Sequence, residues 1–137
     1  MRRWSRPMFA LCCAIQALAT AAETPLQAGQ AAYARGDYAR AADVLAEAVR
    51  RAPADDEAVY WLGKAYGRQA ERAGWLEAVK LARKTRDALE RAVKLNPDNR
   101  DAVRDLADYY DQAPGFLGGD ARKAAALRAR LANLPVP

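Results

Sequence analysis

The chain has 137 residues, with 22 Lys and Arg, 17 Asp and Glu, two Cys and no His. After residue 21 it contains no Cys and no Ser, and Thr24 and Thr85 are its only small hydroxyls. Nucleophilic triads, imidazole acid–base catalysis and His or thiolate zinc sites are therefore excluded there. We expect a protein that is not an enzyme, with no catalytic residues, no metal site and no cofactor.

The first 21 residues have the pattern of a secretory signal peptide. Arg2, Arg3 and Arg6 precede an apolar run over residues 7–19, and Ala19-Thr20-Ala21 has the small-x-small form of a cleavage site. We expect cleavage near Ala21/Ala22 and a periplasmic or secreted protein. The run is shorter than the roughly 20 apolar residues of a membrane span, so no span is expected after cleavage, although a retained anchor is the alternative.

Removing this leader lowers the net charge. It contains three of the 22 basic residues and no acidic residue, which leaves 19 against 17 and a net charge of +2. Nucleic-acid binding normally needs a concentrated basic face, so no nucleic-acid partner is expected. Both cysteines also lie in the leader, so the remaining chain must be held together by packing instead of disulfides.

The first repeat is predicted as a helical hairpin. A helix over 24–35 has Gly29 and Ala32 as small packing positions, Gly36-Asp37 forms the turn, and a second helix follows over Tyr38–Arg51. Pro53 cannot continue a helix interior and ends this hairpin.

The second hairpin is predicted to be longer than the first. Asp55 and Asp56 supply cap chemistry for a helix that runs to about Ala73, where Gly74 would stop it in a left-handed conformation. From Trp75 a long helix follows, in which one side is predicted to hold Trp75, Val79, Ala82, Leu89 and Val93.

A third hairpin follows Asn96-Pro97-Asp98-Asn99. Its first helix is predicted to end near Gln112, and its second covers Ala121 to Asn133. In the connecting loop, we expect Phe116 and Leu117 to tuck into the core, the glycines to reverse the chain, and Asp120 to cap the last helix. A phosphate site at this helix N-terminus is the alternative, but Asp120 would place a negative charge there.

An internal repeat links these hairpins. Leu62-Gly63 and Tyr66 in one copy correspond to Leu106-Ala107 and Tyr110 in the next, 44 residues later. With Ala41, Leu45, Ala48 and Pro53, this pattern resembles the tetratricopeptide repeat (TPR) family, and the long middle repeat with Pro-Gly-x-x-Gly-Gly resembles small exported bacterial TPR proteins. The resemblance implies an all-α, TPR-like solenoid of about three repeats, near 22–55, 56–99 and 100–134, in one domain over 22–137.

The resemblance also implies a concave groove lined by the first helix of each repeat. Its expected binding residues are Tyr33, Tyr60, Lys64, Arg68, Arg104 and Asp108. Some TPR domains clamp a C-terminal carboxylate with a Lys/Asn/Arg set, from which this chain departs at Leu26, Gln30 and Asp108. Tyr33 and Tyr60 could serve as amphipathic anchors or could simply cover helix surface.

Two other charged patterns have plain explanations. Asp101, Asp105, Asp108 and Asp111 are expected to form a solvated helix face partly neutralised by Arg104, since one helix presents too few oxygens for calcium. Lys80, Lys84, Arg91 and Lys94 are expected to form an exposed face, with weak attraction to anionic lipid or envelope polymer as the alternative.

Two hypotheses for function therefore remain open. The first is a scaffold that is exported to the periplasm or cell envelope and binds an unidentified protein or peptide in its groove. The second is a structural subunit that associates with itself or with the envelope.

Overall fold

A computed structural model describes residues 21–136, and the predicted leader therefore lies outside the described residues except for Ala21. In the described part, the chain forms six α-helices, one short 3-10 helix and no strand, which confirms the expected all-α class. The helices are α1 (Pro25–Ala34), α2 (Tyr38–Arg51), α3 (Asp56–Ala70), α4 (Trp75–Leu95), α5 (Arg100–Gln112) and α6 (Ala121–Asn133), with the 3-10 helix η1 (Gly115–Leu117) before α6.

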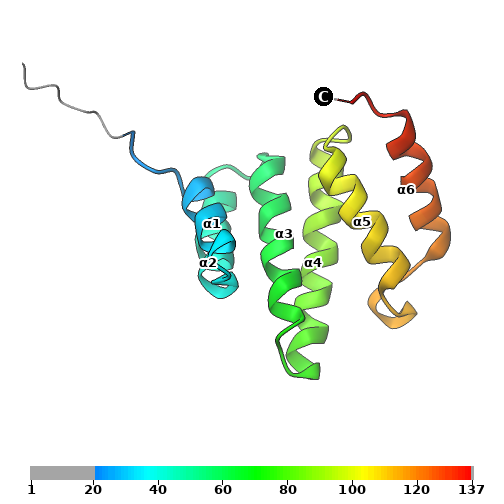
Figure 1. Cartoon of the computed structure of the whole chain (residues 1–137), viewed down its shortest axis with the longest axis horizontal. Coiled ribbons are helices and arrows are strands. Elements are labelled where there is room, and N and C mark those ends of the chain that lie inside the picture. Colours follow the sequence, from blue (N-terminus) through cyan, green and yellow to red (C-terminus); the bar gives the residue numbers. More distant parts are fainter. Residues whose placement is uncertain (1–20, 137) are drawn as a thin grey trace, which may run out of the picture.

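Consecutive helices pair as three hairpins that stand side by side in the order of the sequence (Figure 1). Each helix packs mainly against the one before and the one after it in the chain, and α1 also touches α3. This arrangement of nearest-neighbour contacts is that of a helical solenoid.

Local sequence signals define most helix ends. Asp55 caps α3, where its carboxylate accepts hydrogen bonds from the backbone N–H groups of Glu57 and Ala58, and Asp120 caps α6 in the same way. Thr24 caps α1 in a reciprocal arrangement with Gln27, a signal that the sequence analysis had missed.

The end of α3 differs from the prediction. The helix stops at Ala70 instead of about Ala73, and Gly74 has φ −63°, so it does not adopt the left-handed stop conformation. Gly74 instead occupies the N-cap position of α4. The inserted residues do lengthen the hairpin as predicted, since α3 has 15 residues and α4 has 21.

The core is made of small and branched side chains at the faces where helices meet. One cluster lies between the first hairpin and α3 around Leu45, which is fully buried, and a larger one joins α3, α4, α5 and α6 around Val103. Gly29 is buried opposite Leu45, and Ala32 is also buried, as predicted.

The predicted packing of Phe116 in the core is wrong, and the predicted apolar side of α4 is only partly buried. Phe116 is 69% exposed and does not tuck into the core, whereas Leu117 is half-buried and its carbonyl oxygen accepts a hydrogen bond from the Tyr109 hydroxyl. Trp75 is 76% exposed, although Leu89 and Val93 on the same helix are buried. The buried face of α4 continues through Thr85 and Leu81 and leaves Trp75 outside.

Candidate functional site

A groove of about 240 Å³ lies between α3 and α5, with α4 beneath it. Residues of α3 form one wall, residues of α5 form the other, and Tyr33 closes one side from α1. Thr85 and Leu89 of α4 line the groove between these walls. The expected first helices of the repeats therefore do meet around one hollow.

Gly63 lets α3 approach α4 closely at this place, and Gly67 faces the same helix at an ordinary contact distance. A Cβ atom on Gly63 would lie 3.1 Å from the Cβ atom of Ala88, and one on Gly67 would lie 3.5 Å from Cγ2 of Thr85. Both glycines also line the groove. Larger side chains at these positions would fill it or separate the two helices.

The α3 wall carries positive charge supported by aromatic rings. The Lys64 ammonium nitrogen lies 4.5 Å from the ring centroid of Trp61, 5.3 Å from that of Tyr60 and 5.4 Å from that of Tyr33. These distances are within the range of cation–π attraction, so the three rings hold the Lys64 side chain in place. Burial raises the pKa of the Tyr33 hydroxyl, although the nearby Arg68 opposes this shift.

Arg68 stands one turn further along α3. Its guanidinium is 2.6 Å from the Glu71 carboxylate and 5.5 Å from the Tyr38 ring centroid. The side chain remains about half exposed, so it is accessible to a ligand in the groove.

The α5 wall carries the opposite charge. Asp105 and Asp108 both line the groove, and Asp108 lies 3.2 Å from the Arg128 guanidinium of α6. Arg128 also contacts Asp111, so one arginine bridges two carboxylates of α5. Tyr109 and Gln112 complete this wall.

Tyr60 is not available as an anchor on the surface. It is only 3% exposed, and its hydroxyl donates a hydrogen bond of 2.9 Å to the Asp105 carboxylate. Burial, and then this hydrogen bond, raise the pKa of Tyr60 far above its ordinary value. Tyr60 therefore joins α3 to α5 through its hydroxyl without lining the groove, and of the two roles left open for it, covering and packing is the one observed.

The structure brings four of the six predicted residues to one hollow: Tyr33, Lys64, Arg68 and Asp108. Arg104 does not line it, because its guanidinium turns to Asp101, at 2.8 Å, and to Asp105, at 3.4 Å. Asp105, which does line the groove, was predicted only as part of a solvated helix face. Its position one turn before Asp108 on the same helix was the available signal.

The groove combines positive, negative and hydrogen-bonding side chains. Its titratable lining consists of Lys64, Arg68, Glu71, carboxylates of α5 and two tyrosines. Tyrosine hydroxyls are protonated at neutral pH, and burial raises the pKa values of Tyr33 and Tyr109 further, so both act as hydrogen-bonding groups. None of the helices in residues 21–136 is long and apolar enough to span a bilayer.

Comparison with known proteins identifies the fold. Among solved structures, the chain is similar to the human IFIT1 dimer with PPP-AAAA, with a TM-score of 0.69 and 23% sequence identity over 80% of this chain. The chain spans only 24% of the length of that protein. No protein-family model and no curated protein matches the sequence. The protein thus has a TPR-like helical solenoid fold.

Proposed function

We propose that this protein is a non-enzymatic scaffold, exported to the periplasm or cell envelope, that binds a segment of another protein in the groove between α3 and α5. The observation that carries the proposal is the charge arrangement of the groove. Lys64 and Arg68 are on one wall, and Asp105 and Asp108 are on the other, above a floor that includes Leu89. The basic head, apolar run and small-x-small site of residues 1–21 support the export.

This arrangement favours a polypeptide over a ligand of a single charge sign. A peptide can place an acidic side chain toward α3 and a basic side chain toward α5, while its backbone and apolar groups cover the floor. A solenoid of three short repeats offers a contact surface near or below the roughly 1,000 Å² of a stable interface, so we expect affinity in the micromolar range.

Photo-crosslinking in the cells that make the protein tests this proposal. A photoreactive residue at Gln112, which is exposed and lines the groove, should form adducts with a partner protein. The same residue at Lys94, which is exposed elsewhere on α4, should not form these adducts.

A pair of charge-exchange variants identifies the responsible surface. Arg68→Glu with Asp108→Lys should abolish the Gln112 adducts, whereas Asp43→Lys with Lys94→Glu makes an equal exchange on exposed residues outside the groove and should preserve them. Adducts that survive the first exchange would reject the groove as the binding site. Tyr60→Ala is unsuitable for this purpose because it would remove a buried side chain.

A further inference from the structure

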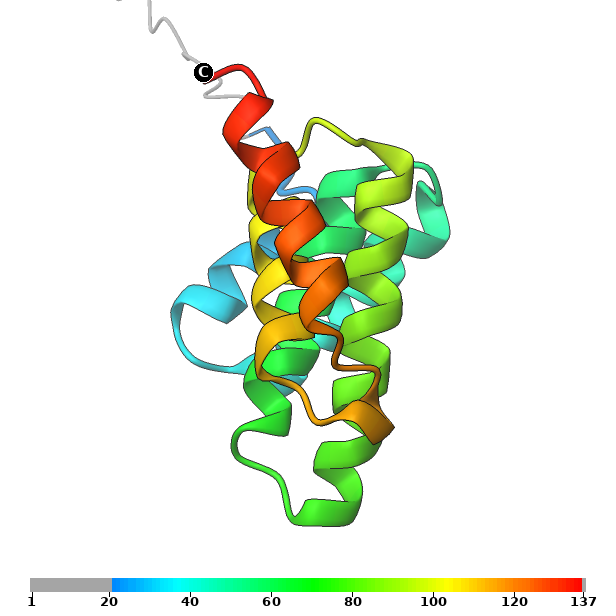
Figure 2. The same cartoon turned by 90° about the vertical axis from the view of Figure 1, so that its right-hand side faces the viewer.

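The end of the α3–α4 hairpin projects beyond its neighbours (Figures 1 and 2). At 1.5 Å per residue, the 21 residues of α4 span about 32 Å, against about 20 Å for the 13 residues of α5. The two helices are joined by a short turn after Leu95, so the excess length lies at the beginning of α4. We call residues 71–84 the hairpin tip.

Within the hairpin tip, the first two residues of α4 have large apolar side chains that are exposed to solvent. Trp75 is 76% exposed and Leu76 is 62% exposed. The short helix η1, drawn in orange, lies toward the same end of the molecule (Figure 2), and its Phe116 is 69% exposed. The core does not use these side chains, and exposed apolar groups gathered at one end of a protein indicate a contact surface.

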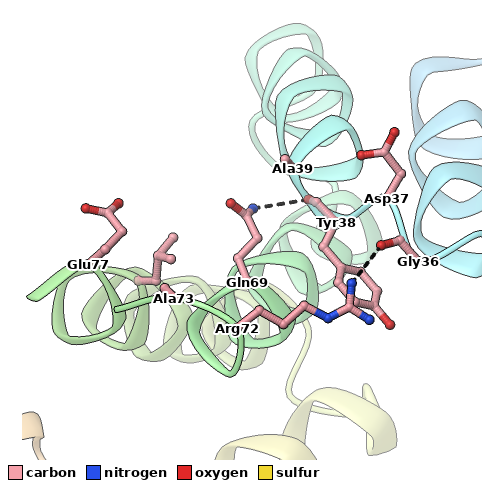
Figure 3. A pocket seen from close by; sticks show the side chains of 9 residues that line it. Gly36, Asp37, Tyr38, Ala39, Gln69, Arg72, Ala73 and Glu77 are labelled. Atoms are coloured by element: carbon pink, nitrogen blue, oxygen red, sulfur yellow. Dashed lines mark hydrogen bonds between the residues drawn. The ribbon is translucent and has the colours of Figure 1, made fainter. Parts of the chain in front are cut away.

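Residues at the end of α3 and in the turn after it form hydrogen bonds to the first hairpin (Figure 3). The Arg72 guanidinium donates a hydrogen bond of 3.2 Å to the carbonyl oxygen of Gly36 and lies 4.5 Å from the Tyr38 ring centroid. The Gln69 amide donates a hydrogen bond of 3.1 Å to the carbonyl oxygen of Tyr38. These contacts border a hollow of about 380 Å³ and support the start of α4 from the side.

The tip also carries the excess positive charge of the chain after residue 21. It contains four basic residues, Arg72, Lys80, Arg83 and Lys84, and two acidic residues, Glu71 and Glu77. The remaining 15 basic residues equal the remaining 15 acidic residues, so the net charge of +2 is that of the tip. Lys80 is 69% exposed, and Arg83 and Lys84 are also exposed.

We propose that the hairpin tip docks on an anionic lipid surface, with Trp75 and Leu76 inserted among the headgroups and the basic side chains beside them contacting lipid phosphates. A convex end with an apolar apex and an adjacent basic collar fits a flat anionic surface, whereas protein hot spots usually occupy well-packed pockets. Tryptophan favours the membrane–water interface because its ring is amphipathic. Basic residues near an anionic leaflet add attraction that salt weakens.

This inference concerns a surface separate from the groove, because neither Trp75 nor Leu76 lines the hollow between α3 and α5. If the hairpin tip binds lipid and the groove binds a protein segment, the protein would hold its partner close to a membrane. The lipid contact can be tested without any protein partner, so its failure would leave the groove proposal standing, and the reverse also holds.

Vesicle flotation of residues 22–137, which contain every described helix, tests the inference. Circular dichroism first verifies that each chain is helical and unfolds cooperatively. The chain should float with vesicles of phosphatidylglycerol and phosphatidylcholine, and less with phosphatidylcholine alone. Trp75→Ala with Leu76→Ala should weaken binding at least about tenfold, because it removes the two large apolar side chains that leave water on insertion. Leu95→Ala, a partly exposed leucine at the other end of α4, should bind as the unchanged chain does.

Charge and fluorescence provide two further readouts. Lys80→Glu with Arg83→Glu should weaken binding at least about tenfold, whereas the same change in net charge through Arg50→Glu with Lys94→Glu should have a much smaller effect. On vesicle binding, tryptophan emission should shift to shorter wavelength, and Trp75→Phe should remove this shift while preserving most of the binding.

Three outcomes would overturn the proposal. The first is a folded chain that binds neither vesicle, and the second is vesicle binding that survives both the apolar and the charge substitutions at the tip. The third is a chain that does not bind vesicles but self-associates in light scattering, with the self-association abolished by Trp75→Ala with Leu76→Ala. That result would assign the tip to contact with a second copy of the chain.

Discussion

Replacing Gly119 by alanine should destabilise the protein strongly, because the loop before α6 has no room for a side chain there. A Cβ atom on Gly119 would lie 2.7 Å from the carbonyl carbon of Ala113 and 3.2 Å from that of Pro114. Both neighbours are backbone atoms, which cannot rotate away as a flexible side chain can. The loop itself would have to move.

The hydrogen bonds of this loop set the size of the effect. The Gly119 N–H donates to the carbonyl oxygen of Pro114 at 3.2 Å, and the Asp120 N–H donates to that of Tyr110 at 2.8 Å. The Asp120 carboxylate in turn caps α6. At about 1 kcal/mol for each hydrogen bond and about 1 kcal/mol for the cap, Gly119→Ala should lower the free energy of unfolding by about 2–4 kcal/mol.

Urea denaturation followed by far-UV circular dichroism measures this effect, and Gly115→Ala is the matched control. A Cβ atom on Gly115 meets nothing within 4 Å, and Gly115 has no positive φ, so we expect a change within about 0.5 kcal/mol. If Gly119→Ala were as stable as Gly115→Ala, the close approach of the loop to α5 would be wrong.

Three further predictions concern packing, titration and the end of α6. Leu45→Ala should lower the free energy of unfolding by about 2–5 kcal/mol, because Leu45 is fully buried between the first hairpin and α3, and a loss below about 1 kcal/mol in urea denaturation would contradict this packing. The unfolding free energy should fall as the pH rises above about 10, because the unfolded chain then loses the Tyr60 proton while the folded state, in which burial and Asp105 raise the pKa of Tyr60, retains it. Tyr60→Phe should make this decline shallower in denaturation series at increasing pH, and an unchanged slope would argue against the buried hydrogen bond. Arg100→Ala should cost about 1–3 kcal/mol and speed amide exchange in the last turn of α6, since the guanidinium donates a hydrogen bond of 2.7 Å to the carbonyl oxygen of Leu134; unchanged exchange there would refute that role.

Helix positions could be read from the sequence because their signals are local. Pro53 excludes a continuing helix, Asp55 and Asp120 offer carboxylates to nearby backbone N–H groups, and apolar residues at helical spacing indicate the buried faces. The end of α3 was misplaced because Gly74 favours either a helix stop or a helix start. The tight turn after Ala70 decides between them.

The groove was only partly predictable because local spacing does not show which side chains a distant helix will cover. Helical spacing places Tyr60, Lys64 and Arg68 on one face of α3, but it does not reveal which of them another helix covers. The cluster formed by α3, α4 and α5 buries Tyr60 and brings its hydroxyl to Asp105, whereas Lys64 lies over three aromatic rings.

The sequence alone determined an all-helical chain of three hairpins with a long middle member, because caps, prolines and periodicity act within a few residues. Only the tertiary structure decided that Trp75 is exposed and that the groove has two oppositely charged walls. Periodicity indicates which residues share a helix face, but the lengths of the neighbouring helices decide how far that face is covered. The first turns of α4 extend past α5, so Trp75 remains in solvent while Leu89 on the same helix is buried.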